Sequence, residues 1–123
     1  MKKGQVLILY DNPLFADGLA SILRREGGLK VESPVGRRGN RRRLIKSLRP
    51  DVVIIEGSNP RADASGVLRE LWKYNTKARV VSVNLNSKDA VVYIGLQFVA
   101  TESNLIKAVR STVPRWFCEL DRK

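Results

Sequence analysis

The sequence predicts a single three-layer α/β domain built around a doubly wound sheet, and three observations support this prediction. Short apolar runs alternate with segments of helical apolar spacing over the first two thirds of the chain. The clearest run, residues 51–56, is β-branched through its middle, which is typical of a strand covered on both faces. The length of 123 residues fits one domain. The alternation implies right-handed crossovers and a parallel sheet with helices on both faces.

The first strand is predicted over residues 5–10 and the first helix directly after it. Asn12 is a good N-cap, and Pro13 suits the first helical position, where its missing N–H costs nothing. Gly27-Gly28 supplies a stop signal. The apolar side chains at helical spacing in this helix are Leu14, Phe15, Gly18, Leu19 and Ile22.

The middle of the chain is predicted to continue the alternation. A weaker strand at 29–33 is closed by Pro34 and Gly36, and a helix over 40–48 ends at Pro50. After the 51–56 strand, a helix capped by Asp63 or Ser65 is expected to run to about residue 74, followed by a strand at 79–85. The side chains expected to face the core from the two helices are Leu44, Ile45, Leu48, Val67, Leu68, Leu71 and Trp72.

The last third breaks this rhythm. Only residues 86–89 separate the 79–85 strand from the apolar stretch 90–96, whereas a parallel crossover needs a dozen or more. We therefore expect an antiparallel hairpin at one edge of the sheet, in place of a fourth crossover helix. A turn at 95–97 would lead into residues 98–100 and complete a short meander.

A final helix is predicted from Glu102 to about Ser111, with Leu105, Ile106 and Val109 facing the core. Pro114 marks its end. The domain is therefore expected to span 1–113, with a tail at 114–123.

Composition excludes several classes of chemistry. The chain has one cysteine, Cys118, and no histidine, which excludes an internal disulfide, a zinc cluster, a Cys-His dyad and a Ser-His-Asp triad. Nothing predicts a metal, a cofactor or an enzymatic function. No apolar run approaches the roughly 20 residues that span a bilayer, and no export signal is recognisable, so a cytoplasmic protein without a membrane partner is expected.

Positive charge is the main compositional bias. The formal charge is +11, and residues 33–50 contain no acid. Such a segment could neutralise phosphates in a salt-dependent, sequence-independent way, or it could be a solvated helix face; the absence of stacking aromatics favours the second interpretation. The candidate anion-binding residues are Arg37, Arg38, Arg41, Arg42, Arg43, Lys46 and Arg49.

Two blocks of sequence resemble the receiver domains of bacterial two-component response regulators. Residues 10–19, Tyr-Asp-Asn-Pro-Leu-Phe-Ala-Asp-Gly-Leu, are similar to the Asp-Asp-His-Pro-Leu-Phe-x-x-Gly-Leu opening of receivers attached to LuxR-type regulators. Residues 50–56, Pro-Asp-Val-Val-Ile-Ile-Glu, resemble the family's Pro-Asp-Val-Val-Leu-Leu-Asp strand, and Asn59-Pro60 stands where Met-Pro follows. The likeness covers residues 5–84 and implies a flavodoxin-like or CheY-like sheet.

The same resemblance implies a phosphorylation site that has been altered. Receivers bind magnesium with an acidic pair, accept the phosphoryl group on an Asp, and place a Thr or Ser and a Lys nearby. Here Tyr10 replaces the first acid and Asp11 remains, Glu56 stands at the acceptor position and Asn84 at the Thr/Ser position. No lysine lies near residues 97–98. The longer Glu side chain and the lost ligands disfavour in-line phosphoryl transfer.

Two interpretations of Glu56 follow. The carboxylate could imitate the charge of a phosphorylated Asp, or it could cap a solvated strand end beside Asp11 without functional meaning; the second is favoured.

The leading hypothesis is a noncatalytic, phosphorylation-independent, receiver-like signalling module, an atypical pseudo-receiver that acts through an unidentified protein partner. The alternative is a small basic protein that binds nucleic acid or another polyanion nonspecifically through residues 37–49. A homodimer is compatible with either.

Overall fold

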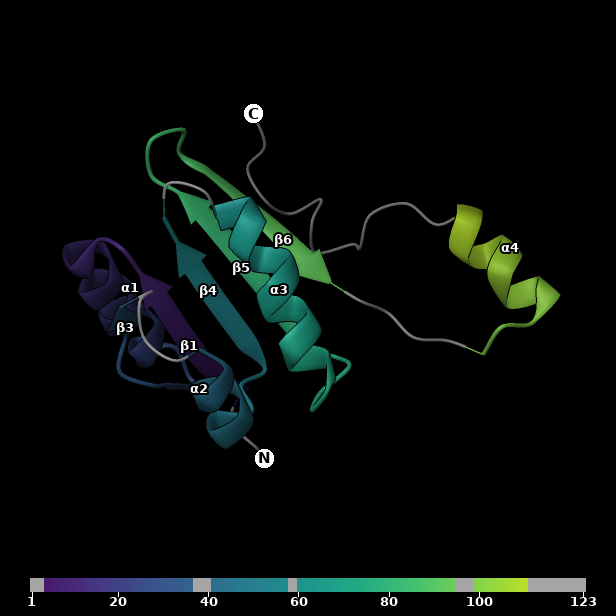
Figure 1. The fold of residues 1–123 in the computed structure, drawn as a ribbon, viewed down its shortest axis with the longest axis horizontal. Coiled ribbons are helices and arrows are strands. Elements are labelled where there is room, and N and C mark those ends of the chain that lie inside the picture. The colour runs from purple at the N-terminus through teal and green to yellow at the C-terminus, as the bar shows by residue number, and fades with distance from the viewer. Residues whose placement is uncertain (1–3, 37–40, 58–59, 95–98, 111–123) are drawn as a thin grey trace.

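The structure is a computed structural model that describes residues 4–36, 41–57, 60–94 and 99–110. The elements follow one another along the chain as in Figure 1. They are β1 (Gly4–Tyr10), α1 (Pro13–Arg25), β2 (Leu29–Val31), β3 (Val35–Gly36), α2 (Arg41–Leu48), β4 (Val52–Glu56), α3 (Pro60–Trp72), β5 (Arg79–Asn84), β6 (Asp89–Ile94) and α4 (Glu102–Arg110).

One mixed sheet organises the chain. Its order is β2-β1-β4-β5-β6, and β3 also pairs with β1. All pairs are parallel except the last, β5 with β6, which is antiparallel. A mostly parallel sheet with helices fits the CheY-like fold that the sequence predicts. The carboxyl ends of β1, β4 and β5 meet at one end of the sheet, called here the carboxyl end; the opposite end is the amino end.

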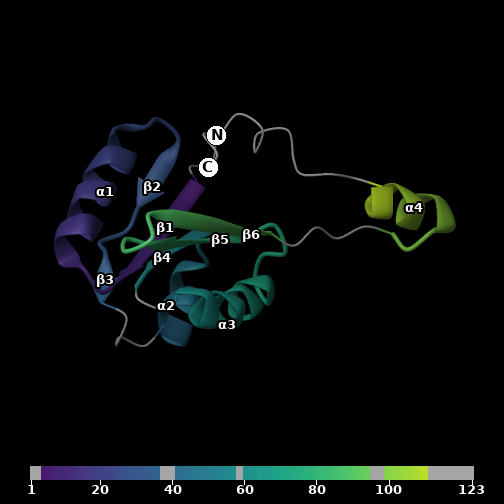
Figure 2. The same ribbon diagram turned by 90° about the horizontal axis from the view of Figure 1, so that it is seen from above.

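Helices cover both faces of the sheet, as expected. Seen along the sheet in Figure 2, α1 lies on one side, and α2 and α3 lie on the other. Each side has its own apolar cluster: Val6, Ile8 and Ile54 pack under α1, whereas the second cluster includes Leu7 and Ile55 and lies against α2 and α3. Burying each such side chain contributes roughly 1.5–3 kcal/mol, so β1 and β4 form the centre of the domain.

Helix α1 begins as predicted, and its most deeply buried side chains are small. Pro13 is its first residue, and the Asn12 side chain accepts a hydrogen bond from the backbone N–H of Phe15. The fully buried positions are Ala16 and Ala20, whereas Leu14 is 85% exposed and Ile22 is 53% exposed. Leu19 is half-buried against the cluster under α1, and the small side chains of Ala16 and Ala20 let the helix approach the sheet closely.

Two boundaries also differ from the predictions. Helix α3 begins at Pro60, so Asp63 and Ser65 lie inside it and neither is the cap. Proline is well tolerated in the first turn, where its missing N–H has no helical partner. Strand β3, after Pro34, was not predicted; it pairs Val35 with Leu9 and so continues the edge that β2 begins. Trp72 is 38% exposed rather than buried in the core.

The hairpin expected after Leu85 is found in strands β5 and β6. They pair over their full length, from Arg79 opposite Ile94 to Asn84 opposite Asp89. Lys88 adopts a positive φ of 60° in the turn. The turn expected at 95–97, Arg37, Arg38, the end of the last helix at 111 and the tail at 114–123 lie outside the described residues, and Val99 and Ala100 belong to no strand.

The last helix does not pack as predicted. Helix α4 stands apart from the sheet in Figures 1 and 2. Leu105, Ile106 and Val109, which were expected in the core, are 48%, 46% and 85% exposed. Helical spacing shows that a helix has an apolar face, but it does not show which surface covers that face. None of the helices among the described residues is both long and apolar enough to cross a bilayer.

Candidate functional site

The carboxyl end of the sheet brings the receiver-like positions together. Strands β1, β4 and β5 are parallel neighbours, so Asp11, Glu56 and Asn84 all stand at or just beyond the carboxyl end of a strand. The register pairs Leu9 with Ile55, which makes Tyr10 and Glu56 the next residues on adjacent strands. Crevices at this end of an open α/β sheet are the usual ligand sites of such folds.

Glu56 is the central residue of this region and is 5% exposed. Its Oε1 accepts two hydrogen bonds, from the backbone N–H of Asp11 (N···O 3.1 Å) and from that of Asn12 (2.6 Å). The interpretation favoured from the sequence placed this carboxylate at a solvated strand end. That placement is wrong, because the side chain is buried. Glu56 instead joins the end of β4 to the loop between β1 and α1.

The start of helix α1 explains why a carboxylate is favourable here. The first N–H groups of a helix have no partner within the helix, and the helix dipole places partial positive charge at this end. Glu56 binds the N–H groups of the two residues that directly precede Pro13, the first residue of α1. The side chain thus supplies an anion beside a helix N-terminus, where such a charge is stabilising.

Tyr10 and Asp11 have different surroundings although they are adjacent. Tyr10 is half-buried and packs against the apolar cluster under α1, so its ring has a structural role. Asp11 is exposed. Nowhere in the described ranges do three or more His, Cys, Asp or Glu side chains gather where they could hold a metal ion.

Asn84 is part of the β5–β6 turn. Its Oδ1 accepts hydrogen bonds from the backbone N–H groups of Asn86 (3.0 Å) and Ser87 (3.3 Å). This is the local side-chain-to-backbone bonding by which Asn favours turns. The oxygen therefore stabilises the hairpin.

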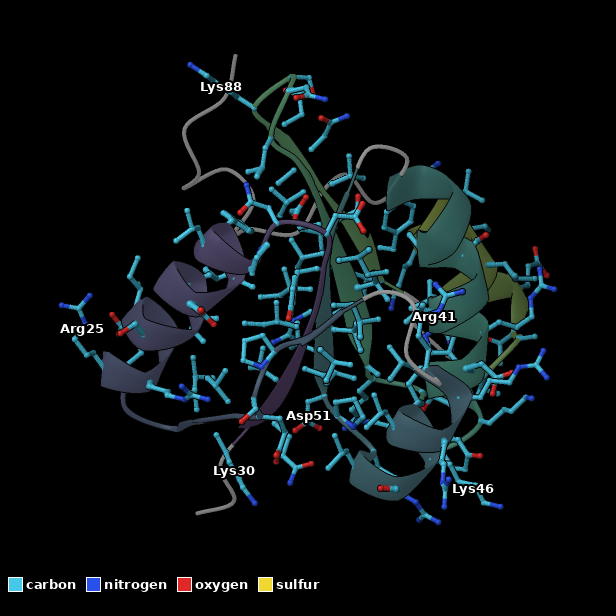
Figure 3. The ribbon with its side chains drawn as sticks, turned by 60° about the vertical axis from the view of Figure 1, so that its left-hand side comes forward. Arg25, Lys30, Arg41, Lys46, Asp51 and Lys88 are labelled. Carbon is cyan, nitrogen blue, oxygen red and sulfur yellow. The ribbon has the colours of Figure 1, made fainter. Side chains whose placement is uncertain are left out.

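Basic side chains are spread over several surfaces of the molecule, outside the candidate segment 37–49 as well as within it. In Figure 3 the labelled side chains of Arg25, Lys30, Lys46 and Lys88 extend from different parts of the molecule. Arg49, with a positive φ of 46°, lies over the ring of Tyr74 at 5.2 Å from the ring centre. Within the candidate segment, Arg49 is thus held against an aromatic ring.

One basic groove does form between α2 and α3. It has a volume of about 200 Å³ and includes apolar side chains in its lining. Arg42 Nε lies 3.6 Å from Glu70 Oε1, which partly neutralises it. The charged residues that line the groove are Arg41, Arg42, Arg69 and Glu70.

A second carboxylate of the same strand region was missed in the sequence. Asp51 accepts hydrogen bonds from the backbone N–H of Gln5 at Oδ2 (2.9 Å) and from the Asn75 side chain at Oδ1 (3.0 Å). These bonds lie at the amino end of the sheet, and Figure 3 labels Asp51 there. The position before a buried strand was the available signal, but the partner Asn75 is 24 residues away and carries no recognisable motif.

Comparison with known proteins gives a limited but consistent result. No family model matches the chain. Two curated proteins, from two strains of Mycobacterium tuberculosis and both named "Probable transcriptional regulatory protein NarL", are each 28% identical to it over 116 residues. The match covers 88% of this chain and 54% of each relative, so the chain spans about half the length of these proteins. The similarity and the mostly parallel sheet are together consistent with a receiver-like domain.

Proposed function

We propose that this chain is a noncatalytic, receiver-like signalling module that works without phosphorylation, through contacts with another protein. The observation that carries the proposal is the state of Glu56. Its Oε1 is already bound by two backbone N–H groups, and the side chain is almost fully buried. A nucleophile must present an oxygen in line with an incoming phosphodonor, and a side chain that is 5% exposed, with one oxygen already bound, gives a donor little access, so this carboxylate is poorly placed for phosphoryl transfer.

The surroundings of Glu56 support the same proposal. Magnesium prefers several oxygen ligands in near-octahedral geometry, and Tyr10 supplies an apolar ring where the resemblance leads one to expect a carboxylate. The Asn84 oxygen is engaged in the hairpin turn. We further propose that the β5–β6 hairpin stands in place of the fourth crossover helix of receivers, which gives this edge of the sheet a different partner surface.

Treatment with acetyl phosphate, or with beryllofluoride, in the presence of magnesium tests the proposal. Intact mass spectrometry is expected to find no phosphoryl adduct, and calorimetry is expected to find no saturable beryllofluoride binding. A receiver with an Asp acceptor, treated in parallel, is the positive control. The Glu56→Asp variant is expected to remain unmodified too, because Tyr10 and Asn84 are unchanged. Stoichiometric modification of the natural chain that disappears in Glu56→Gln would refute the proposal.

A second candidate function is supported by the groove between α2 and α3. Arg41, Arg42 and Arg69 converge there and could bind the phosphates of a nucleic acid. Glu70 in the same lining and the spread of the other basic residues make this the weaker candidate. The curated relatives are named as transcriptional regulatory proteins, but the chain spans only about half of their length.

A gel-shift titration across a salt series separates the two candidates. If the groove is a nucleic-acid site, Arg69→Ala weakens binding at physiological salt, whereas the matched variant Arg25→Ala, on α1, leaves it unchanged. Nonspecific attraction to a chain of charge +11 would instead be lost at physiological salt and would respond equally to both variants.

A further inference from the structure

The groove between α2 and α3 is small and combines charge with an apolar bottom. Ile45 and Val67, which are 1% and 4% exposed, belong to its lining, so its deepest part is apolar. Its volume of about 200 Å³ lies below the roughly 300–1,000 Å³ of pockets that enclose a small-molecule ligand. The groove therefore suits one or two side chains of a longer molecule. The described residues that line this α2–α3 groove are Arg41, Arg42, Ile45, Gly66, Val67, Arg69 and Glu70.

Gly66 leaves the groove open on the side of α3. This residue is exposed and lies inside the 13-residue helix. A Cβ added to it would meet no described atom within 4 Å beyond its own stretch of helix, and its φ is not positive, so neither crowding nor backbone conformation requires glycine. Glycine is less favourable than alanine inside a helix. The missing side chain does let another chain come close to the backbone of α3.

Arginines from both helices give the groove an excess of positive charge. Figure 3 shows Arg41 at the start of α2, beside α3. Three arginines stand against one acid, Glu70, whose Oε1 already has two cationic neighbours, Arg42 Nε at 3.6 Å and Lys73 Nζ at 3.1 Å. The Arg42 side chain is 84% exposed, and exposed ion pairs are weak, so a carboxylate from a partner can displace Glu70 from it. The groove therefore favours an anionic partner.

Carboxylates of a protein fit this lining better than the phosphates of a nucleic acid. None of the lining residues that the structure describes is aromatic, so they offer no surface on which bases could stack. A nucleic acid carries a charge at every phosphate and would meet the Glu70 carboxylate, whereas a peptide can place an aliphatic side chain over Ile45 and Val67. The overall charge of +11 also steers an acidic protein toward the chain.

We propose that the α2–α3 groove binds an acidic segment of a protein partner, with an aliphatic side chain of that segment on Ile45 and Val67 and its carboxylates on Arg42 and Arg69. This inference rests on the proposed function, because it names the surface and the chemistry of the protein contact. Its failure would leave the absence of phosphorylation untouched, which the acetyl phosphate treatment tests separately.

Fluorescence anisotropy with a labelled peptide, a pair of leucines flanked on each side by glutamates, tests the proposal at physiological salt. Saturable binding is expected, and Gly66→Leu should weaken it at least about tenfold, because the new side chain fills the groove. The matched control is Gly18→Leu, at an exposed glycine of α1 with equally open surroundings, which should bind the peptide as the natural chain does. Both substitutions should raise the melting temperature, since leucine is the better helix former, so lost binding cannot come from unfolding.

Two further comparisons separate the groove from general attraction to a basic chain. Arg69→Ala should weaken peptide binding about three- to fivefold, whereas Arg25→Ala, which removes the same charge on α1, should not. A peptide with glutamine in place of glutamate should bind at least about tenfold more weakly than the acidic one. The proposal is overturned by an absence of saturable binding, by equal losses in Gly66→Leu and Gly18→Leu or in Arg69→Ala and Arg25→Ala, by equal affinity for the glutamine peptide, or by tighter binding of an oligothymidylate of the same length.

Discussion

The two ends of strand β4 carry acidic side chains that bind backbone groups of the β1 region, and they do so in different surroundings. At the amino end, Asp51 uses both oxygens, one for the N–H of Gln5 and one for the Asn75 amide. At the carboxyl end, Glu56 receives the N–H groups of Asp11 and Asn12 on a single oxygen. Glu56 is nearly inaccessible, whereas Asp51 is only partly buried.

The comparison shows that the acid at the carboxyl end of β4 makes the same kind of structural hydrogen bond as the acid at the amino end. In a phosphoaccepting domain, one would expect the amino end to hold the fold and the carboxyl end to keep a reactive acid free. Here both ends of β4 use an acid to hold β1 in place. The following predictions test whether Glu56 contributes to the stability of the fold, as Asp51 is expected to do.

The largest effect is expected for Glu56→Ala. The substitution removes a nearly inaccessible carboxylate and leaves two N–H groups in partly buried surroundings without their acceptor, which should lower the free energy of unfolding by about 3 kcal/mol. Urea denaturation followed by circular dichroism measures this as a lower midpoint with an unchanged slope. Glu56→Gln keeps an acceptor oxygen and should recover more than half of the loss. Full stability in Glu56→Ala would show that the carboxylate is not structural, and the parallel with Asp51 would fail.

A smaller loss, about 2 kcal/mol, is expected for Asp51→Ala, because the Asp51 side chain is itself only half-buried. Asn75→Ala removes one of the two bonds of Asp51, together with an exposed bond from the backbone N–H of Lys77 to Asn75 Oδ1, and should cost about 1 kcal/mol. In the double variant the losses should be less than additive, since both residues share one hydrogen bond. The same urea titration provides all three values; additive losses would mean that the Asp51–Asn75 bond contributes nothing.

For Asn12→Ala, loss of the cap of α1 should cost about 1 kcal/mol. Asn12→Ser, which retains a capping oxygen, is the control. This variant sharpens the comparison, because the backbone N–H of Asn12 would still bind Glu56 while the side-chain bond to Phe15 is lost. A loss as large as that of Glu56→Ala would indicate that the cap, not the carboxylate, fixes the loop.

The smallest effect, about 0.5 kcal/mol, is expected for Asn84→Ala, because the N–H groups of the exposed turn can bind water instead. Asn84→Asp keeps the acceptor and should be nearly neutral. Hydrogen exchange of the Asn86 and Ser87 amides, followed by NMR, should accelerate in Asn84→Ala alone. Unchanged exchange rates in Asn84→Ala would show that the Asn84 side chain does not stabilise the turn.

The parts of the fold that could be predicted are those with a local cause. Asn12-Pro13 marks the start of α1, the β-branched run marks β4, and a connection of four residues requires a hairpin. The exposed face of α4 could not be predicted, because apolar spacing identifies a face but not its partner. Strand β3 was missed because two residues after a proline give no periodicity.

The candidate site was predictable in position but not in bonding. The resemblance implied that Asp11, Glu56 and Asn84 lie at one end of the sheet, and in the structure they stand at the carboxyl ends of their strands. The acceptor roles of Glu56 and Asn84 depend on where loop N–H groups point after folding, and no sequence motif specifies this. For the same reason the role of Asp51 was not recognised until its partner Asn75 could be located.

The reversal of direction at β6 also determines where the chain leaves the sheet. A last strand parallel to β5 would deliver the following segment to the carboxyl end, beside Asp11 and Glu56. Because Ile94 pairs with Arg79, the exit lies at the opposite end, the full length of a six-residue strand away. At about 3.3 Å per residue this separation is close to 20 Å. The loop before α1 and the point where the chain leaves β6 are therefore separated by the full length of the sheet, and a partner bound beside one of them would not also cover the other.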